Sequence, residues 1–550
     1  MSERALVPTA WTTGTTEVFK TGTWRAALPR HIHAPSPCHV ACPVNGEIAE
    51  WIGLARAGDL RGAWHVLARH NPFPAIVGRI CHHPCESACN RAALDGAVSI
   101  RALERHVGGT AIAQGWGFDA PGAARGERIA IIGGGPSGLS AAFHLRRSGY
   151  AVTLHEARSA LGGVMRHGIP PYRLPRAVLD AEIARVLELG IEVRCGEALS
   201  TRDDLERMRT RFDAVYLAIG AGRAKRVPAL DYTKPWMLDG SAYLAAVSTG
   251  DVPTLGRRVV VIGGGSAAMD VARTARRAGH EVTVLALESM ADMPAQREEI
   301  EQAREEGVRL LDSAMLTEAI EAGALGVIVR CARVRFERGA APGEFTTTVL
   351  PDRGFCITAD AIIAAIGQDP EVSPFRDLLE LNGRIVRTDA SQATSVPGCY
   401  AGGDLTSHAR FVTDAIAAGK RAAHAIDARL RGRRACAAAA ESVVPFAAIN
   451  SFYHAARPRA VPARADALER LATSCEVEQG LAGAQALAEM QRCFSCGTCI
   501  HCDNCVEYCP DLAVRRDNGG YIVLGDYCKG CGVCVRECPT GSMRMIEEAR

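Results

Sequence analysis

The spacing of apolar positions divides this chain into stretches that predict different kinds of structure. Between residues 36 and 115, apolar residues recur at the spacing of amphipathic helices, for example along 48–70. At Arg128, and again at Arg258, a short apolar run leads into a glycine-rich turn and a long amphipathic stretch, which predicts a strand, a turn and a helix. Two copies of this unit predict two nucleotide-binding domains rather than a short-period repeat.

The same patterns predict how the domains follow one another. The strand that returns the chain to the first nucleotide-binding domain is expected at 360–367, and the stretch from residue 491 is dense in cysteine. We expect an irregular arm at 1–35, a helical domain at 36–120, a first nucleotide-binding domain at 127–235 and 360–430, a second one inserted at 236–359, a helical connector at 431–490 and a cysteine-rich domain at 491–550.

Composition excludes several classes of protein. The chain has 550 residues, 48% of them hydrophobic and 23% charged, with a formal net charge of +2. This balance argues against a dedicated nucleic-acid binder or a polybasic membrane binder. No apolar run reaches the roughly 18 residues of a transmembrane helix, and the N-terminus lacks the apolar core of a secretory signal. We therefore expect a cytoplasmic protein without a membrane span.

The first glycine-rich turn carries the pattern GxGxxG at Gly133, Gly135 and Gly138. The first glycine permits the tight turn, the second lets the backbone approach a pyrophosphate, and the third lets helix pack on strand. Pro136 and Ser137 begin the helix, whose N-terminus attracts phosphate. The next strand ends at Glu156, where a carboxylate can bind the ribose hydroxyls of an adenosine. A packing turn without a ligand is the alternative, which the strand, helix and acidic residue together disfavour.

The second turn repeats this design with Gly263, Gly265 and Ala268, followed by a strand whose tip is Leu287-Glu288. An NADP site needs a cation at this tip for the 2′-phosphate, whereas an NAD site favours an acid for the 2′-hydroxyl. A carboxylate at Glu288 therefore favours NAD(H), although it could also be a solvated loop charge. The residues expected at the nicotinamide dinucleotide are Gly263, Gly265, Ser266, Ala267 and Glu288.

Two nucleotide sites in one chain suggest a flavin and a nicotinamide that exchange hydride. The stretch 399–423 reads as a strand, a Gly-Gly-Asp turn and a helix. Within it, Gly403 and Asp404 could meet a ribityl hydroxyl, and backbone amides near Thr413 could meet the flavin ring. We find no cysteine pair near the first nucleotide-binding domain, so a dithiol mechanism is disfavoured. The expected flavin is FAD.

The tail carries two cysteine runs of the form CxxCxxCxxxCP. In bacterial ferredoxins, three close cysteines wrap one [4Fe–4S] cluster and the fourth ligates the other cluster. Structural zinc is the rival, but it does not explain two such runs. Cys493 and Cys496 lie upstream, as bystanders or as ligands in a shifted register. The expected sets are Cys499, Cys502, Cys505 and Cys538 for one cluster, and Cys509, Cys528, Cys531 and Cys534 for the other.

Five more cysteines lie in the helical domain, in the patterns CxxxCP and CxxxCxxxC. One [4Fe–4S] cluster needs four thiolates. A zinc knuckle or free buried thiols are alternatives, since His82 and His83 lie beside these cysteines. The preferred ligands are Cys42, Cys81, Cys85 and Cys89, which leaves Cys38 unassigned and gives three clusters in all.

Several of these motifs resemble the small subunit of glutamate synthase. They include NPFPAIVGRICHHPCESAC, VSIRALERHV, GGGPSGLSAA, GGVMRHGIPPYRLP, GGGSAAMDVARTA, AIGQDP and AGGD. The same module, about residues 36–430, resembles the N-terminal part of dihydropyrimidine dehydrogenase, and the tail resembles ferredoxin-bearing members. The resemblance implies that Glu156 and Arg173 contact FAD. It also brings Gly163 to the FAD site and Gly367 to the nicotinamide site.

The chain departs from that resemblance at three places. Relatives often carry a CxxC pair upstream of CxxxCP for a second N-terminal cluster, and none precedes Cys38 here. Position 77 is Val where many relatives have Cys. Relatives that use NADPH carry two arginines where this chain has Leu287 and Glu288. We therefore expect no second N-terminal cluster and keep the preference for NAD(H).

The predicted fold is α/β, with two Rossmann-like domains, the second inserted in the first. An α-helical iron–sulfur domain precedes them and an α+β ferredoxin-like domain follows. We expect an enzyme that moves electrons between NAD(H), FAD and [4Fe–4S] clusters, as a module of a larger hetero-oligomeric oxidoreductase. The alternatives are a free-standing NAD(P)H:ferredoxin oxidoreductase, a glutamate synthase small subunit, and a non-catalytic electron-wire or assembly subunit.

Overall fold

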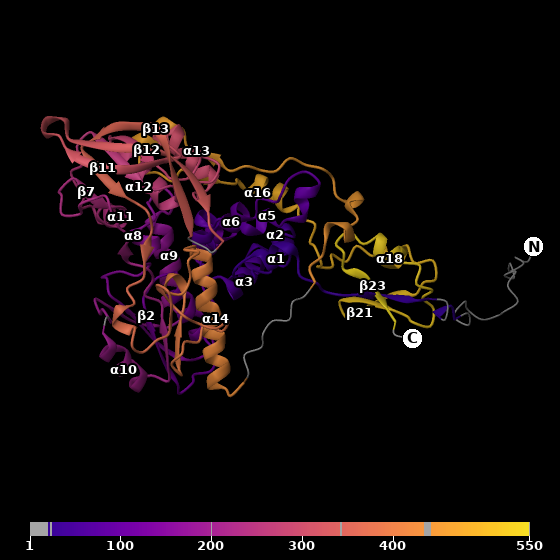
Figure 1. The fold of residues 1–550 in the computed structure, drawn as a ribbon. Helices are drawn as coiled ribbons and strands as arrows, with labels where there is room; N and C mark the ends of the chain where they lie inside the picture. The colour runs from indigo at the N-terminus through magenta and orange to yellow at the C-terminus, as the bar shows by residue number, and fades with distance from the viewer. Residues whose placement is uncertain (1–19, 23–24, 200, 341–343, 434–441, 549–550) are drawn as a thin grey trace, which may run out of the picture.

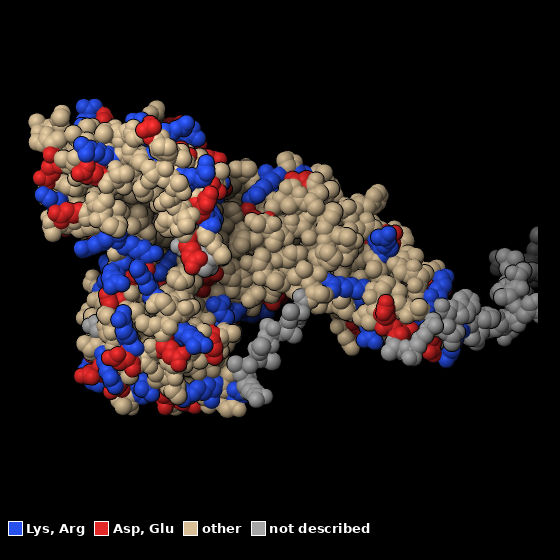
Figure 2. All heavy atoms as spheres, in the orientation of Figure 1, with Lys and Arg blue, Asp and Glu red and all other residues tan. Residues whose placement is uncertain are grey.

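The computed structural model describes residues 20–22, 25–199, 201–340, 344–433 and 442–548. Two nucleotide-binding domains lie one above the other on the left of Figure 1, the helical domain lies in the centre and the cysteine-rich domain lies on the right. Figure 2 shows acidic and basic side chains interspersed over both nucleotide-binding domains, with fewer charges over the centre of this face. No helix within the described ranges is long and apolar enough to cross a membrane.

The helical domain packs around two tryptophans, Trp51 and Trp64, that are fully buried. Its helices begin at side-chain caps where the sequence offers them: the Asp59 carboxylate accepts the Gly62 N–H at 2.7 Å, and Ser36 accepts the His39 N–H at 3.3 Å. The helices are α1 (Pro37–Ala41), α2 (Ile48–Arg56), α3 (Leu60–His70), α4 (Pro74–Ile80), α5 (Pro84–Ser87) and α6 (Ile100–Ala113).

The first nucleotide-binding domain is built on a parallel sheet with strand order β18-β5-β2-β3-β4 in the described residues. Helices α7 and α14 pack against each other beside this sheet. The strands are β2 (Arg128–Ile132), β3 (Ala151–Glu156), β4 (Glu192–Cys195), β5 (Ala214–Leu217) and β18 (Cys399–Ala401). The helices are α7 (Pro136–Arg147), α8 (Val164–His167), α9 (Arg176–Leu187), α10 (Arg202–Arg211) and α14 (Val412–Leu430).

The second nucleotide-binding domain repeats the arrangement with strand order β10-β9-β8-β14-β7 in the part of the chain described. An antiparallel layer of β11, β12 and β13 packs beside it. The strands are β7 (Met237–Asp239), β8 (Arg258–Ile262), β9 (Glu281–Leu285), β10 (Arg309–Leu311), β11 (Ala314–Glu321), β12 (Val327–Arg338), β13 (Phe345–Ala359) and β14 (Ala361–Ala364). The helices are α11 (Gly240–Thr249), α12 (Ser266–Arg277) and α13 (Arg297–Glu305).

The return to the first domain differs from the expectation. The stretch 360–367 contains β14, which pairs in parallel with β7 and β8 and therefore belongs to the second domain. The strand that rejoins the first sheet is β18, which pairs with β5. The two crossings between the domains pair with each other, β6 (Arg223–Ala224) against β15 (Gln368–Asp369). The buried run Ala361–Ala364 suits either sheet, so its apolar pattern does not decide between them.

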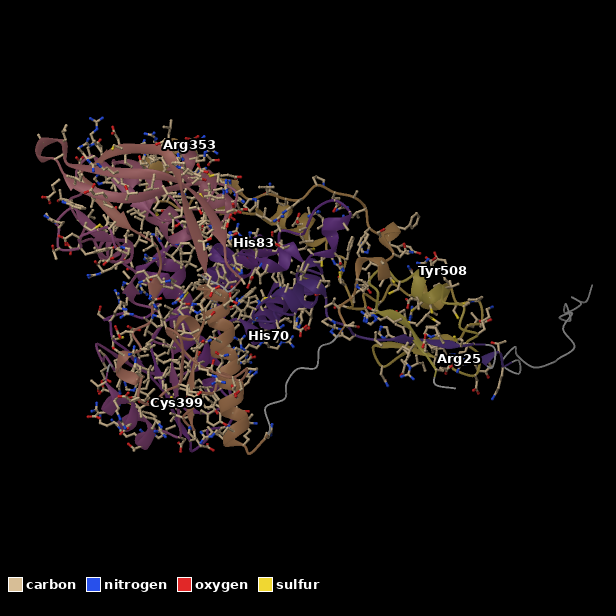
Figure 3. All side chains as sticks on the ribbon, in the orientation of Figure 1. Arg25, His70, His83, Arg353, Cys399 and Tyr508 are labelled. Carbon is tan, nitrogen blue, oxygen red and sulfur yellow. The ribbon has the colours of Figure 1, made fainter. Side chains whose placement is uncertain are left out.

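Part of the expected irregular arm at 1–35 forms a strand in the cysteine-rich domain, while residues 1–19 and 23–24 of it lie outside the described residues. Residues 27–31 form β1 (Ala27–His31), which pairs antiparallel with β23 (Met543–Glu547). Arg25, labelled at this end of the molecule in Figure 3, forms an ion pair with Glu548 at 2.6 Å. The remaining elements of the domain are α17 (Asn504–Glu507), β21 (Val514–Asp517), β22 (Gly520–Val523) and α18 (Val533–Arg536).

The described part of the connector is mostly irregular rather than helical, and residues 434–441 of it lie outside the described residues. Prolines at 445, 458 and 462 prevent long helices because each lacks an N–H and restricts the residue before it. Its described elements are the 3₁₀ turns Phe446–Ala448 and Ser451–Tyr453, β19 (Ala463–Arg464), α15 (Ala467–Ala472), β20 (Glu478–Gly480) and α16 (Gly483–Met490).

The second nucleotide-binding domain contains a buried ion group. Removing one of its charges tests how much this group contributes to the stability of the domain. Glu306 accepts hydrogen bonds from Arg273 at 2.7 Å and Arg277 at 2.9 Å, and Glu306 and Arg273 are both buried. We expect Glu306→Gln to lower the stability of this domain by about 3–5 kcal/mol, because it leaves buried guanidinium charge uncompensated. Thermal unfolding of the holoprotein checks this as a drop of several degrees in the midpoint.

Glu281→Gln is the matched control, since Glu281 pairs with Arg257 on the surface of the same domain. We expect this variant to unfold at the wild-type temperature. Equal midpoints for the two variants would contradict a structural role for the buried ion group.

Candidate functional site

A large cleft opens at the carboxyl ends of β2, β5 and β18, with a cavity volume of about 610 Å³. Ligands of parallel α/β sheets bind at this edge. Most residues expected at FAD lie here together, whereas Gly138, Arg173 and Thr413 are not among the lining residues. The expected residues that line the cleft are Gly133, Gly135, Pro136, Ser137, Glu156, Gly163, Gly403 and Asp404.

The glycines of the first turn have separate physical roles. Gly133 has φ +109°, and a Cβ on it would lie 2.3 Å from the Ala218 carbonyl oxygen. A Cβ on Gly138 would lie 1.9 Å from the Gly133 carbonyl oxygen, so this glycine serves helix packing. A Cβ on Gly135 would meet no protein atom closer than the Gly163 Cα at 3.9 Å. The open face at Gly135 is the cradle into which a dinucleotide pyrophosphate fits.

Glu156 closes one end of this cleft. Its two carboxylate oxygens accept the Gly134 and Arg158 backbone N–H groups, each at 2.8 Å. The carboxylate is thereby held at the tip of β3, beside the glycine turn, where it can accept a hydrogen bond from the adenosine ribose of FAD.

The far end of the cleft touches the helical domain. Phe411 and Val412, at the N-terminus of α14, line the cleft, and the Phe411 ring stacks on His82 with centroids 3.9 Å apart. The adjacent Thr413 faces away from the cleft, and its hydroxyl lies 3.8 Å from the Cys81 sulfur. Thr413 therefore links the flavin cleft to a cysteine rather than lining it.

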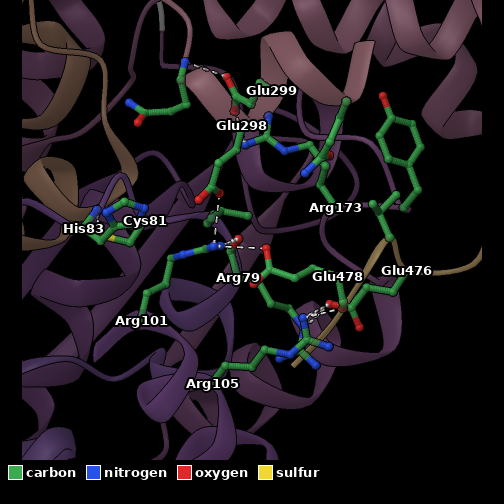
Figure 4. Close-up of a pocket in the computed structure, with 15 residues that line it drawn as sticks. Arg79, Cys81, His83, Arg101, Arg105, Arg173, Glu298, Glu299, Glu476 and Glu478 are labelled. Atoms are coloured by element: carbon green, nitrogen blue, oxygen red, sulfur yellow. Dashed lines mark hydrogen bonds and ion pairs between the residues drawn. The ribbon is translucent and has the colours of Figure 1, made fainter. Parts of the chain in front are cut away.

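Arg173 lies outside the flavin cleft, contrary to what the resemblance implied. It pairs with Asp270 on α12 at 2.6 Å and with Glu299 on α13 at 2.5 Å, so its charge is used at the contact between the two nucleotide-binding domains. Figure 4 shows it at the edge of an ion network that ties α4, α6, α13 and the connector together. The members are Arg79, Arg101, Arg105, Arg173, Glu298, Glu299, Glu476 and Glu478.

The second glycine turn has the same geometry as the first. Gly263 has φ +136°, and a Cβ on it would lie 2.5 Å from the Ala365 carbonyl oxygen. Ser266 and Ala267 begin α12, and Ala268 takes the position that Gly138 holds in the first domain. Gly367 has φ +98° and begins the crossing back to the first domain.

Glu288 stands over the second turn as Glu156 stands over the first. A Cβ on Gly264 would lie 2.6 Å from a Glu288 carboxylate oxygen, and a Cβ on Gly134 would lie 3.1 Å from that of Glu156. Burial raises the pKa of Glu288, and the charge of Arg338 opposes that rise. The Glu288 carboxylate thus has the same place relative to its glycine turn as the Glu156 carboxylate has in the first domain.

The cysteines of the helical domain fall into two groups rather than the expected one. Cys42, Cys81 and Cys85 lie within electrostatic reach of one another, and we name them the flavin-side cysteines. The fourth member of this group is a carboxylate, Glu104, which acts electrostatically on all three thiols. Burial raises the pKa of Glu104 to about 8, and Asn71 donates to it at 2.9 Å.

Cys89 lies apart from the flavin-side cysteines, so the expected set of Cys42, Cys81, Cys85 and Cys89 does not match the structure. It lines a separate cavity with Cys38 and with two cysteines from the far end of the sequence, Cys493 and Cys496. The sequence offered no local signal for this grouping. The spacing of CxxxCxxxC treats Cys85 and Cys89 alike, and Glu104 belongs to no cysteine motif.

The tail cysteines gather as their spacing predicts. One cavity is lined by Cys499, Cys502, Cys505 and Cys538, so the last cysteine of the second run joins the first three of the first run. Burial raises the pKa of Cys534, and Cys509, Cys528 and Cys531 add to that rise, so these four thiols also lie together. In the described residues no group of His, Cys, Asp or Glu converges on a single metal ion, and Cys499, Cys502, Cys505 and Cys538 instead surround a cavity.

Family comparisons agree with these sites. A model described as pyridine nucleotide-disulphide oxidoreductase matches residues 127–419, which is more than half of the chain. The chain belongs to the pyridine nucleotide-disulphide oxidoreductase family. Residues 31–116 match dihydropyrimidine dehydrogenase domain II, a 4Fe–4S cluster domain, and residues 498–543 match a 4Fe–4S dicluster domain. The chain is therefore an oxidoreductase with a FAD-type fold and [4Fe–4S] domains, and the α/β prediction with its two iron–sulfur domains is confirmed.

Named relatives of this oxidoreductase cover most of its length. The β subunit of NADP(+)-dependent formate dehydrogenase from Moorella thermoacetica is 31% identical over 84% of this chain and 70% of its own. The PreT subunit of NAD-dependent dihydropyrimidine dehydrogenase from Escherichia coli K12 is 32% identical over 73% of this chain and 92% of its own. The glutamate synthase small chain of Azospirillum brasilense is 32% identical over 72% of this chain and 86% of its own. The last two bear out the predicted family resemblance.

The disulphide in the family name has no counterpart in this oxidoreductase's first nucleotide-binding domain. The cysteines described there are Cys195 and Cys399, both free. They lie on β4 and β18, the two opposite edges of the sheet. The contact that this domain does make with a cysteine is that of Thr413 with Cys81 of the helical domain.

The open face at Gly135 yields a test of the flavin site. We expect Gly135→Ala to fold, because its φ of −77° and ψ of −175° suit alanine and the new Cβ meets no protein atom within 3.9 Å. We expect FAD affinity to fall at least about tenfold, or 1.4 kcal/mol, because the methyl group occupies the pyrophosphate's place. FAD content per chain after gel filtration measures this.

Gly109→Ala on α6 is the control, since a Cβ there meets nothing within 4 Å and lies in another domain. It should retain FAD at the wild-type ratio. Full FAD retention by Gly135→Ala would show that the pyrophosphate does not lie against this turn.

Proposed function

We propose that this chain is the NAD(H)-linked electron-transfer subunit of a larger oxidoreductase. The observation that carries the proposal is the contact between the flavin cleft and the cysteines of the helical domain. Phe411 lines the cleft and stacks on His82, and Thr413, two residues on, contacts the neighbouring Cys81. Through this contact, electrons can pass from the flavin cleft to the cysteines of the helical domain without a disulfide.

The residues divide the work of hydride and electron transfer between two domains. FAD, when bound, supplies chemistry that couples the two-electron hydride of a nicotinamide to one-electron clusters. The two glycine turns and their carboxylates, Glu156 and Glu288, hold the two dinucleotides. The paired strands β6 and β15 set how the second domain faces the first. No side chain of the chain needs to act as general acid or base in this scheme.

The flavin-side cysteines are the first acceptors beyond the flavin in this proposal. Glu104 stands where a fourth ligand is needed, so we propose that Cys42, Cys81, Cys85 and Glu104 hold one [4Fe–4S] cluster. The two tail groups hold two more, as their spacing predicts.

Assembly into a complex is proposed from the relatives. The formate dehydrogenase and dihydropyrimidine dehydrogenase relatives are named as subunits, as is the NADPH-Fe(3+) oxidoreductase β subunit of Geobacter sulfurreducens, 29% identical over 84% of this chain. Ferredoxin, or a larger catalytic subunit, is the partner we propose for the tail.

Anaerobic purification from the native host, with mass spectrometry of whatever copurifies, tests this assignment. A larger catalytic subunit in constant ratio would support the proposal. Recovery of the chain alone, with FAD bound and able to reduce ferredoxin with NADH, would replace it with a free-standing NADH:ferredoxin oxidoreductase. Copurification of a glutamate synthase large chain would replace it with a glutamate synthase small subunit. Failure of NADH and NADPH alike to bleach the flavin would favour a non-catalytic wire.

The preference for NAD(H) has its own test at Glu288. A carboxylate beside the ribose accepts a hydrogen bond from the 2′-hydroxyl and repels a 2′-phosphate. We expect wild-type kcat/KM to favour NADH, and Glu288→Arg to shift the NADH-to-NADPH ratio at least about tenfold toward NADPH, or 1.4 kcal/mol. Steady-state reduction of ferricyanide or a viologen dye by each nucleotide measures the ratio.

Glu281→Arg is the control, because Glu281 lies at the opposite end of β9 from Glu288. It adds the same charge change to the domain and should leave the ratio unchanged. A wild-type preference for NADPH would overturn the role given to Glu288.

A further inference from the structure

Four cysteines meet where the two ends of the chain come together, between the helical domain and the cysteine-rich domain. One lies in α1, one follows α5, and two lie at the start of the cysteine-rich domain, about 400 residues later in the chain. Their thiols lie within electrostatic reach of one another. We name this group the junction cysteines: Cys38, Cys89, Cys493 and Cys496.

The junction cysteines surround a cavity like the one in the ferredoxin tail. The space between protein atoms is about 350 Å³ at the junction and about 300 Å³ at the tail cavity, which also has four cysteines in its wall. The rest of the junction wall is mostly aliphatic, with Ile48, Ile52 and Val98 among its residues. A family match assigns the tail cavity to a 4Fe–4S domain. The junction cavity therefore has the size and the donor set of a [4Fe–4S] site.

Hydrogen-bond donors point at the sulfurs of this group. Asn90 donates its side-chain N–H to the Cys496 sulfur at 3.4 Å, and the Ser495 backbone N–H donates to the Cys493 sulfur at 3.4 Å. The Ser36 hydroxyl lies 3.1 Å from the Cys38 sulfur. Such bonds stabilise thiolate ligands and help set cluster potentials. Arg91 is also in the cavity wall, where its guanidinium pairs with Asp95.

We propose that the junction cysteines ligate a fourth [4Fe–4S] cluster, held between the two ends of the chain. Four thiolates around an enclosed, largely apolar cavity match the ligand set of such a cluster. Tetrahedral zinc would draw the four sulfurs toward one point at about 2.3 Å each, and no such convergence occurs in the described residues. The expectation of three clusters is thereby revised to four.

The position of this site gives it a role as a relay, and this part of the inference rests on the proposed function. Cys38 lies in α1 and Cys42 caps its C-terminus, and Cys85 and Cys89 are four residues apart at α5, so the junction and flavin-side groups are neighbours. On the other side Cys496 and Cys499 are three residues apart, a reach of at most about 11 Å. The site therefore lies between the flavin-side cluster and the tail clusters, and accepts and passes one electron at a time.

Iron and acid-labile sulfide, measured per FAD in the anaerobically purified full-length holoprotein, test the site. We expect about 16 iron atoms per chain, at four per cluster, and about 12 in the double variant Cys493→Ala/Cys496→Ala. Cys475→Ala is the control, since Cys475 lies in the preceding connector and lines none of the cysteine cavities described here. The Cys475→Ala variant should retain about 16 iron atoms per chain.

A wild-type content of about 12 iron atoms per chain would overturn the proposal. This holds whether or not the chain also binds one zinc ion. An unchanged iron content in the double variant would overturn it as well. The wild-type count keeps the site testable even where the double variant fails to fold.

Rapid mixing with NADH, followed by freeze-quench EPR, tests the relay separately. We expect NADH to bleach the flavin of the double variant at the wild-type rate, while reduction of the tail clusters slows at least about a hundredfold. Unchanged tail reduction would overturn the relay. If NADH fails to bleach the wild-type flavin, the proposed function is wrong. The iron content still tests the junction site in that case.

Discussion

A buried ion group holds the segment just before Cys493 against the helical domain, and the meeting of distant cysteines depends on it. Arg492, only 1% exposed, donates to the Glu489 carboxylate at 2.6 Å and to Asp95 at 2.9 Å. Arg91 donates to the Arg492 carbonyl oxygen at 2.9 Å and lies over the Phe494 ring. Ions this deeply buried must be fully paired, because losing one partner costs about 3–5 kcal/mol. The group therefore admits one placement of residues 493–496 against the helical domain.

This placement orders the cysteine groups along the molecule. The flavin cleft touches the flavin-side cysteines through His82 and Phe411, and these cysteines share α1 and α5 with the junction cysteines. The tail groups follow three residues beyond the junction. Cysteines that are close in sequence along short helices and turns thus belong to neighbouring groups in space. The pairing of β1 with β23 fixes the tail itself, because it joins the first described strand of the chain to the last.

The two nucleotide-binding domains show how one design serves two ligands. In both, a glycine with positive φ makes the turn and a carboxylate from the next strand stands over it. The third position differs: Gly138 leaves no room for a Cβ, whereas Ala268 is tolerated in the second domain. Helix and strand therefore pack more closely in the first domain. Arg173 joins the domains through Asp270 and Glu299, so its charge serves the interface rather than the flavin.

The sequence by itself determined the features that depend on residues close together in the chain. The glycine turns, the carboxylates at Glu156 and Glu288 and the division of the tail cysteines could all be predicted, because each depends on spacing within one short motif. Spacing also determined that iron–sulfur chemistry is present. It did not determine the whole ligand set of the helical domain, because CxxxCxxxC does not distinguish Cys85 from Cys89.

Only the tertiary structure decided which distant segments meet. The buried strand β14 suits a parallel sheet in either domain, so its apolar pattern could not place it in the second. Residues 27–31 lack a clear period, and they become a strand only because β23 offers an edge to pair with. Cys493 and Cys496 join Cys38 and Cys89 because buried ions hold the connector against the helical domain. Such contacts depend on burial and charge compensation between segments some 400 residues apart, so no local sequence pattern indicates them.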